Sequence, residues 1–328
     1  MRLRQPPVPP LPSSATFRDR TAIVTGGNTG IGLGVARELL RLQCKTLILA
    51  CRSPSRAESA RQSLLAEFPS LPPDTIQFKS LDLDSYTSVQ NFVAEIRRDV
   101  PVVDLLVLNA GAGFFPTLET SAEHHERTIQ TMYLSNVLLL LSLLPHLEAS
   151  KDKSGRVSHV TWVGSRMIYP IIQKNVLPAD DESILGYFDN PEHYVMMERY
   201  GQSKLLCLAF FYELCQRLGR DRVIMNMVCP GAVATELARY MPLVYKPLVW
   251  VYYKLVNRTT EKGAWLVLNP SLVAGAHSHG AFYGDENVEP VHPFFKTEAG
   301  SHLQRRVWEE TMVEMGKTQL VTDSLGLN

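Results

Sequence analysis

Tyr200 and Lys204, a tyrosine and a lysine four residues apart, form a pair suited to proton transfer. Residues at this spacing stand on one face of a helix, so both side chains can converge on one bound molecule. A free tyrosine titrates near ~10, and a nearby ammonium group lowers that pKa by favouring the phenolate. The pair indicates general acid–base chemistry, although a motif this short is, by itself, more often a coincidence on a surface helix.

A glycine-rich turn, Thr25–Gly32, is the second segment with chemical potential and reads TGGNTGIG. A β-branched segment, Thr21–Thr25, precedes the turn, and a helix with an apolar face follows from Ile31. Such a turn brings the backbone close to a pyrophosphate, while the helix N-terminus offers free N–H groups and the positive end of its dipole. We therefore predict a dinucleotide-binding loop, and the alternative is an ordinary strand-to-helix turn.

Arg52 follows the next expected strand, where dinucleotide-binding folds discriminate between their two cofactors. An acidic residue at this place would bond the ribose 2′-hydroxyl, whereas an arginine would accept a 2′-phosphate. Arg52 therefore predicts NADP(H). The alternative is a solvated loop cation, because single arginines beside strand ends are common.

These residues need a framework, and short β-branched segments alternate with helical periodicity from Thr21 onward. This alternation predicts an α/β fold in which helices cover both faces of a doubly wound parallel sheet, the Rossmann-type arrangement. The expected strands are Thr21–Thr25, Thr46–Ala50, Ile76–Leu81, Val103–Leu108, Arg156–Val163 and Val223–Val228. We expect one long irregular segment, between Ser165 and Glu198.

The composition narrows the class of partner. The 328 residues are 45% hydrophobic, which is enough for one large core. Lys+Arg and Asp+Glu number 33 each, so no global field attracts nucleic acid or an anionic membrane, and a small-molecule ligand fits better. The five cysteines and the histidine pairs lack metal-ligand spacing, which predicts a cytoplasmic protein with reduced cysteines and no metal.

The chain resembles the classical short-chain dehydrogenases/reductases, especially the retinol-dehydrogenase-like and fungal pathway branch, from about Thr21 to Tyr283. Five motifs in the same order carry the resemblance. They are the glycine loop Thr25–Gly32, Leu81–Leu83, Leu108–Gly111, Tyr200–Lys204 and Cys229–Thr235. Since the family often forms dimers through its later helices, the resemblance is compatible with a homodimer.

The resemblance implies a role for each matching residue. Tyr200 would donate a proton to a carbonyl oxygen during reduction, and Lys204 would lower the pKa of Tyr200 and hold the nicotinamide ribose. Asp82 would contact the adenine ring. The residues assigned to the cofactor in this way are Gly26, Asn28, Gly30, Ile31, Gly32, Arg52, Asp82, Asn109, Tyr200, Lys204, Val233 and Thr235.

Two positions depart from the family pattern. The serine that bonds the substrate carbonyl aligns with Trp162, whose bulky indole can donate one hydrogen bond but accepts none. A bulge or a changed strand end could bring in Thr161 or Ser165 as the hydroxyl donor instead. The asparagine that holds a relay water aligns with Met132, which cannot relay a proton, and Asn136 lies one turn further on.

The two terminal regions and one apolar segment complete the expected organisation. Residues 1–17 form a flexible proline-rich arm before an oxidoreductase domain, residues 18–328. An apolar lid at about residues 236–257 suits a bulky apolar substrate, and an ordinary amphipathic helix on the core is the alternative. Within it, Met241–Val256 is too interrupted to span a bilayer but is compatible with peripheral membrane contact.

Three functions remain open from the sequence. The first is an NADP(H)-dependent oxidoreductase acting on a carbonyl or alcohol of a bulky apolar molecule, in a secondary-metabolite pathway. The second, motivated by Trp162 and Met132, is the same fold used for a non-redox step, as an isomerase or cyclase. The third is a pseudoenzyme that serves as an interaction module.

Overall fold

The computed structural model describes residues 5–175, 177–245, 247 and 258–318. The strands are β1 (Thr21–Thr25), β2 (Thr46–Cys51), β3 (Ile76–Ser80), β4 (Leu105–Leu108), β5 (Ser158–Val163), β6 (Val223–Cys229), β7 (Phe282–Gly284) and β8 (Asn287–Val288). The helices are α1 (Gly30–Arg41), α2 (Pro54–Glu67), α3 (Tyr86–Asp99), α4 (Arg127–Ile129), α5 (Ser135–Ser154), α6 (Ile168–Lys174), α7 (Ile184–Asp189), α8 (Met196–Arg217), α10 (Thr260–Asn269) and α11 (Glu298–Gly316).

One eight-stranded sheet has the order β3–β2–β1–β4–β5–β6–β7–β8. The strands pair in parallel except for β7 and β8, which are antiparallel. The order reverses between β1 and β4, so this is the predicted doubly wound α/β fold. The six predicted strands are confirmed within two residues at each end, whereas β7 and β8, of three and two residues, are too short to show a periodicity.

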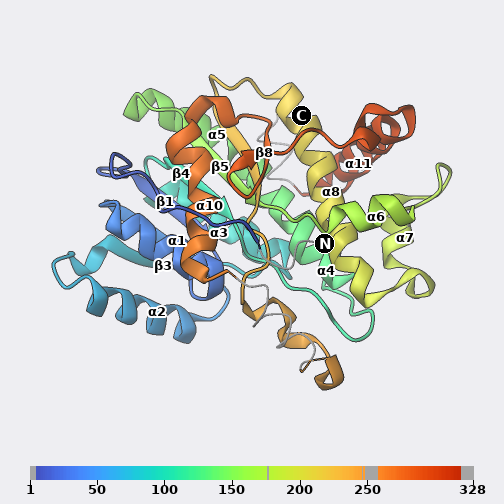
Figure 1. Ribbon diagram of the computed structural model, residues 1–328, viewed down its shortest axis with the longest axis horizontal. Coiled ribbons are helices and arrows are strands. Elements are labelled where there is room, and N and C mark those ends of the chain that lie inside the picture. Colours follow the sequence, from blue (N-terminus) through green and yellow to red (C-terminus); the bar gives the residue numbers. More distant parts are fainter. Residues whose placement is uncertain (1–4, 176, 246, 248–257, 319–328) are drawn as a thin grey trace.

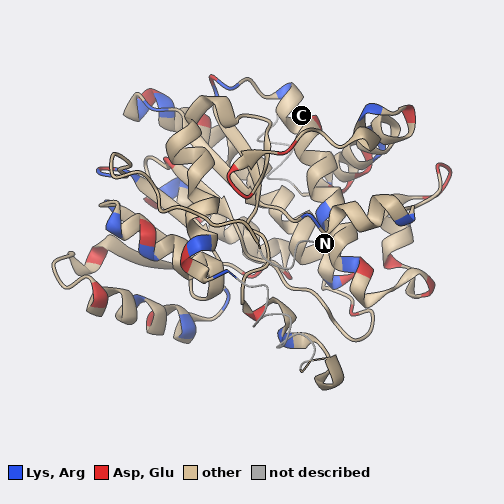
Figure 2. Ribbon diagram, viewed as in Figure 1, with Lys and Arg blue, Asp and Glu red and all other residues tan. Residues whose placement is uncertain are grey.

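Helices cover both faces of the sheet (Figure 1). On one face, α1 packs against α10 through apolar side chains such as Val35, Leu39 and Ala264, which are all fully buried. On the other face, α3, α5 and α8 enclose the larger hydrophobic cluster. Figure 2 shows that acidic and basic residues alternate along outer helices such as α2. Charged residues of both signs therefore lie mainly on the outer helices.

The most apolar helical stretch fills this core. Residues 127–154 form one continuous helical run in which a π-helical turn, Gln130–Leu134, joins α4 to α5. This run is long and apolar enough to cross a membrane, but 94% of its most apolar window is buried inside the fold. Burial against the sheet and its neighbouring helices accounts for that composition.

The segment between Ser165 and Glu198 contains helices in its described residues, 165–175 and 177–198, so the expectation of an irregular segment is wrong. It contains α6, α7 and a 3-10 turn, Pro191–His193. Glu310 of α11 accepts hydrogen bonds from the Ser183 hydroxyl and from the first backbone N–H groups of α7. A carboxylate from more than 100 residues away therefore caps this helix, and local sequence patterns contain no signal for such a cap.

The two predicted terminal features are only partly described. Residues 5–17 contain no helix or strand, but Val8 and Phe17 are buried, so this part of the predicted flexible arm lies against the domain. Residues 236–245 of the predicted lid form 3-10 turns. Residues 246 and 248–257 lie outside the described part of the chain, and most of the segment proposed for membrane contact lies there.

His125 links α7, in the segment between Ser165 and Glu198, to α11. Its Nδ1 lies 2.8 Å from Asp189 and its Nε2 lies 3.2 Å from Glu314. Burial opposes protonation, but the hydrogen bonds to the two carboxylates outweigh it and raise the pKa of His125 to about 9. Lys317 and Tyr86 also contact Glu314, so α11 is held by one connected polar cluster.

We expect the His125 cluster to stabilise the fold at neutral pH and to lose this contribution at alkaline pH. Because the folded pKa lies above the ordinary value near ~6.5, the contribution is complete below pH ~6.5 and is lost as the pH rises through about 9. The thermal midpoint of the wild type should fall between pH 7 and pH 10 more steeply than that of His125→Asn. The matched control, His277→Asn at an exposed histidine, should follow the wild type; parallel curves for all three proteins would contradict the assignment.

Candidate active site

A pocket of about 1010 Å³ opens at the carboxyl ends of the parallel strands. In a doubly wound sheet this edge, beside the reversal of strand order, is where ligands bind. The five sequence motifs meet there although they are far apart along the chain. The predicted site residues that line the pocket are Gly26, Asn28, Gly30, Ile31, Arg52, Asp82, Asn109, Ser165, Tyr200, Lys204, Val233 and Thr235.

The glycine loop has the geometry that its sequence predicts. Gly26 and Gly30 adopt φ angles of +65° and +55°, a left-handed conformation that other residues rarely take. A Cβ atom on Gly32 would collide with the carbonyl oxygen of Gly26 and lie 2.7 Å from the amide nitrogen of Asn109. The start of α1 therefore lies directly against the turn and directs its free N–H groups into the pocket.

Thr25 ties this loop to the end of β4. Its hydroxyl accepts hydrogen bonds from the backbone N–H groups of Asn109 and Ala110, both at 2.9 Å, and donates to the carbonyl of Val107. The Asn109 side chain in turn donates to the Thr25 carbonyl at 2.9 Å. These bonds hold the turn and the Asn109 motif as one rigid wall.

The residues present fit a dinucleotide. The loop supplies a cradle that a single Cβ at Gly32 would fill, the helix N-terminus supplies donors for phosphates, and Asp82 and Asn109 lie beside them in the same pocket. When bound, a nicotinamide dinucleotide would supply hydride chemistry at this edge of the sheet.

The cradle predicts that Gly32→Ala loses dinucleotide binding, because the added methyl group pushes α1 away from the Gly26 carbonyl. We expect at least a roughly tenfold rise in the Kd for NADPH, since a backbone clash of this kind costs more than ~1.4 kcal/mol. Calorimetric titration measures it, with far-ultraviolet circular dichroism to confirm the fold. Gly316→Ala is the control because no atom lies within 4 Å of its added methyl group; equal affinity in both variants would refute the cradle.

Tyr200 and Lys204 lie one turn apart on α8 and both reach the pocket. The Lys204 amine donates to the Val163 carbonyl at 2.8 Å and lies 6.0 Å from the centre of the Tyr200 ring. Complete burial lowers the pKa of Lys204 from its ordinary value. Phe114 stacks on the Tyr200 ring at 5.2 Å, so the tyrosine lies between an aromatic wall and a buried amine.

Buried contacts of its neighbour fix the start of α8. The Arg199 guanidinium donates to the carbonyls of Phe188 and His193 at 2.9 and 3.0 Å and lies 3.9 Å from the buried Glu126 carboxylate. The segment between Ser165 and Glu198 is thereby anchored next to Tyr200. These contacts hold the start of α8, from which Tyr200 reaches the pocket.

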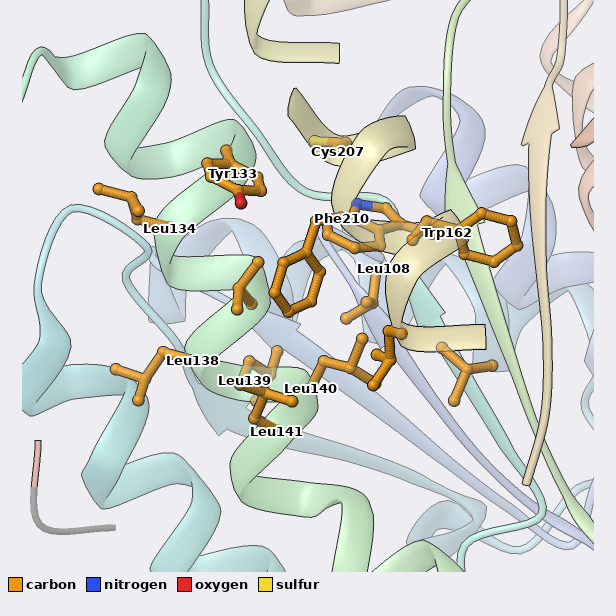
Figure 3. Close-up of a cluster of buried hydrophobic side chains, with 14 of the residues drawn as sticks. Leu108, Tyr133, Leu134, Leu138, Leu139, Leu140, Leu141, Trp162, Cys207 and Phe210 are labelled. Carbon is orange, nitrogen blue, oxygen red and sulfur yellow. The ribbon is translucent and has the colours of Figure 1, made fainter. Parts of the chain in front are cut away.

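Of the three candidates for the carbonyl donor, the structure brings only Ser165 to the pocket. Trp162 is 1% exposed and packs in the core between the sheet and α8, as Figure 3 shows, beside Leu108 and Phe210. Thr161 faces the opposite side of β5, where its hydroxyl bonds Ser271 at 2.7 Å. The alignment that placed an indole at the reacting carbonyl is therefore wrong, because β5 ends at Val163 and Ser165 follows it.

Met132 lines the pocket, and Asn136 does not replace the family's asparagine there. The Asn136 amide is 1% exposed and donates to the backbone carbonyls of Thr131 at 2.8 Å and Met132 at 3.2 Å. It satisfies carbonyl groups next to the π-helical turn, which is a structural role. The Met132 side chain packs against the backbone of Gly111, so it fills the space next to the Leu108–Gly111 motif.

The placement of Ser165 and Thr161 predicts opposite effects of removing their hydroxyl groups. Ser165→Ala should lower kcat by roughly 10²- to 10³-fold, as the loss of one oxyanion-type donor does, with little effect on stability. Thr161→Val should lower the thermal midpoint, because Ser271 loses a buried partner, and leave kcat within about twofold. The reverse pattern would show that the wrong hydroxyl faces the substrate.

Among the pocket residues missed from the sequence, three have clear contacts. The Gln5 side chain donates to the Ala232 carbonyl at 2.8 Å and accepts from its N–H at 2.9 Å, which braces the last motif from the start of the chain. Phe114 adopts φ +61° over Tyr200, and Arg239 lines the pocket near Arg52. Gln5 lies far from every motif in the chain, while Phe114 and Arg239 lie a few residues after two of the motifs but carry no residue pattern of their own.

The doubly wound fold and its glycine-lined pocket are those of a dinucleotide-binding oxidoreductase, and comparisons identify the family. The sequence model of the family described as short chain dehydrogenase matches residues 20–173. Short chain dehydrogenase macD of Penicillium terrestre is 40% identical over 316 residues, covering 95% of this chain and 96% of that protein. Short chain dehydrogenase yanD of Aspergillus niger is also 40% identical, over 317 residues, with coverage of 95% and 96%. The chain belongs to the short chain dehydrogenase family of oxidoreductases.

Solved structures share the fold. A 3-oxoacyl (acyl-carrier-protein) reductase from Agrobacterium tumefaciens with NADP bound has a TM-score of 0.61 at 21% identity, covering 82% of this chain and 93% of that chain. The L-sorbose reductase of Gluconobacter frateurii, complexed with NADPH and L-sorbose, has a TM-score of 0.61 at 18% identity, covering 82% and 96%. At these identities the likeness concerns the fold alone.

Proposed function

We propose that this protein is an NADP(H)-dependent oxidoreductase that transfers a hydride to or from a carbonyl or alcohol carbon of a bulky apolar molecule. One observation carries the proposal: Tyr200, Lys204 and Ser165 line the same pocket as the glycine loop and Arg52. A proton donor, a carbonyl donor and a dinucleotide cradle thus share one volume.

Each of these side chains has a defined task in the proposed reaction. Ser165 donates a hydrogen bond to the carbonyl oxygen, and Tyr200 gives that oxygen its proton. Lys204 is buried against the Val163 carbonyl, and the ribose hydroxyls of a bound cofactor are the further acceptors that favour its charged form. The charged amine lowers the pKa of Tyr200 and so eases the transfer.

The proposal extends to the substrate and the setting. Phe114, Met132, Met167 and Leu237 line the pocket, which favours an apolar substrate with one reactive carbonyl. The NADP or NADPH in the two structural neighbours supports the cofactor, as Arg52 does. The fungal relatives support a place in secondary metabolism. We further propose a cytoplasmic protein, and the homodimer and the peripheral membrane contact remain predictions.

The non-redox alternative loses much of its supporting evidence. It rested on Trp162 and Met132, and Trp162 lies in the core rather than in the pocket. Met132 alone removes a relay group and leaves the proton donor and the carbonyl donor in place. An oxidoreductase therefore explains the site better than an isomerase, a cyclase or a pseudoenzyme.

We expect NADPH to bind more tightly than NADH, and Tyr200→Phe to keep that affinity while turnover falls at least ~10²-fold, as loss of a general acid does. Calorimetric titration gives the affinities, and NADPH oxidation with a panel of apolar aldehydes and ketones gives the turnover. Failure to bind either nucleotide would remove the cofactor assignment. Turnover unaffected by Tyr200→Phe would remove the proton donor.

A further inference from the structure

A cluster of three arginines lies at the end of the pocket where β2 gives way to α2. Arg52 and Arg56 come from that turn, and Arg239 comes from the 3-10 turn Glu236–Tyr240, more than 180 residues later in the chain. All three side chains line the pocket and are between 34% and 50% exposed. Two distant segments thus present guanidinium groups to one place.

A single carboxylate holds the two segments together. Glu236 Oε2 lies 2.6 Å from Arg56 Nη2 and 3.7 Å from Arg239 Nη1. Thr29, at the N-cap of α1, also interacts with this carboxylate. In this structure Glu236 is therefore the anion around which the basic cluster gathers.

The other side of the cluster involves Tyr240. Arg52 interacts with its hydroxyl and favours the phenolate, and the Arg239 guanidinium lies over its ring at 4.9 Å. Arg52 also lies 3.6 Å from Asp84, but Asp84 is held at 2.6 Å by Arg127. Arg127 is shared with Glu119, at 2.6 Å, and the contact of Arg52 with Asp84 is the longer one, so Arg52 is loosely held and can turn toward another anion.

The cluster offers several charge-assisted donors to a phosphate monoester. Arg52, Arg56 and Arg239 lie at this end of the pocket beside the carboxylates of Glu236, Asp82 and Asp84, and a phosphate monoester carries about −1.5 to −2 at pH 7. Guanidinium groups suit such an oxyanion because their planar N–H donors pair with two oxygens at once.

We propose that Arg239 is a ligand of the cofactor's 2′-phosphate, together with Arg52. The phosphate then joins the β2–α2 turn to the Glu236–Tyr240 turn, as Glu236 does without it. The inference rests on the proposed NADP(H) dependence and adds to it a specificity-determining residue from a segment beyond the dinucleotide motifs.

The same contact reaches the reacting end of the pocket. The Tyr240 ring stacks on Phe115 at 4.8 Å, and the adjacent Phe114 stacks on Tyr200 at 5.2 Å. Leu237 and Arg239 of the 3-10 turn line the pocket itself. Binding of a 2′-phosphate therefore stabilises the wall that the Glu236–Tyr240 turn contributes to the substrate side.

The test uses adenosine 2′,5′-bisphosphate and 5′-AMP as probes, which differ only in the 2′-phosphate. By calorimetry, Arg239→Ala should weaken the bisphosphate by roughly 3- to 10-fold, the worth of a half-exposed charge-assisted contact, and leave 5′-AMP unchanged. Arg217→Ala is the matched control, since Arg217 also pairs with a glutamate and lies over an aromatic ring but is on the far part of α8. It should leave both affinities unchanged.

Hydrogen exchange supplies a second measurement that a merely structural arginine would not alter. Amides of residues 235–245 should exchange more slowly when the bisphosphate is bound than when 5′-AMP is bound, and Arg239→Ala should abolish that difference. Equal weakening of both probes in Arg239→Ala, or no weakening, overturns the inference.

Arg52→Ala separates this inference from the proposed cofactor. If the wild type does not prefer the bisphosphate, the NADP(H) assignment itself fails, and the role of Arg239 fails with it. If the wild type prefers the bisphosphate and Arg52→Ala removes that preference while Arg239→Ala keeps it, only the role of Arg239 fails.

Discussion

The close backbone approach between α1 and the turn before it is the constraint on which the site depends. Gly32 lies so near the Gly26 carbonyl that a methyl group has no room, and Thr25 and Asn109 hold this arrangement through three hydrogen bonds. Because these bonds join the ends of β1 and β4, they fix the edge where the strand order reverses. The other functional groups are placed relative to that edge.

The chemistry of the pair on α8 depends on burial. Lys204 is surrounded by protein, and burial lowers its pKa, so its charge requires acceptors at close range. The Val163 carbonyl is one of them, and it stands at the end of β5, two residues before Ser165. The same strand end therefore holds the amine and delivers the hydroxyl, which keeps the proton donor, its partner and the carbonyl donor in one geometry.

Ion pairs and hydrogen bonds around the pocket join residues that are close in space but far apart in the chain. Arg258 donates to the carbonyls of Pro6 and Pro230 and lies 2.5 Å from Asp285, so the start of the chain, the last motif and the strand edge form one network. Glu236 links the turns at the opposite end of the pocket in the same manner. These polar links tie segments beside the pocket that are far apart in the chain, whereas the apolar layers hold the sheet and its helices together.

The sequence by itself determined the doubly wound sheet, the glycine cradle and the pair Tyr200 and Lys204, because periodicity, tight turns and helical spacing are local properties. The tertiary structure alone decided that Ser165 rather than Trp162 faces the pocket, since that depends on where β5 ends. It alone brought Arg239 to Arg52 and made His125 a link between two distant segments. Such contacts join residues whose separation in the chain carries no periodic signal, so only the packed fold reveals them.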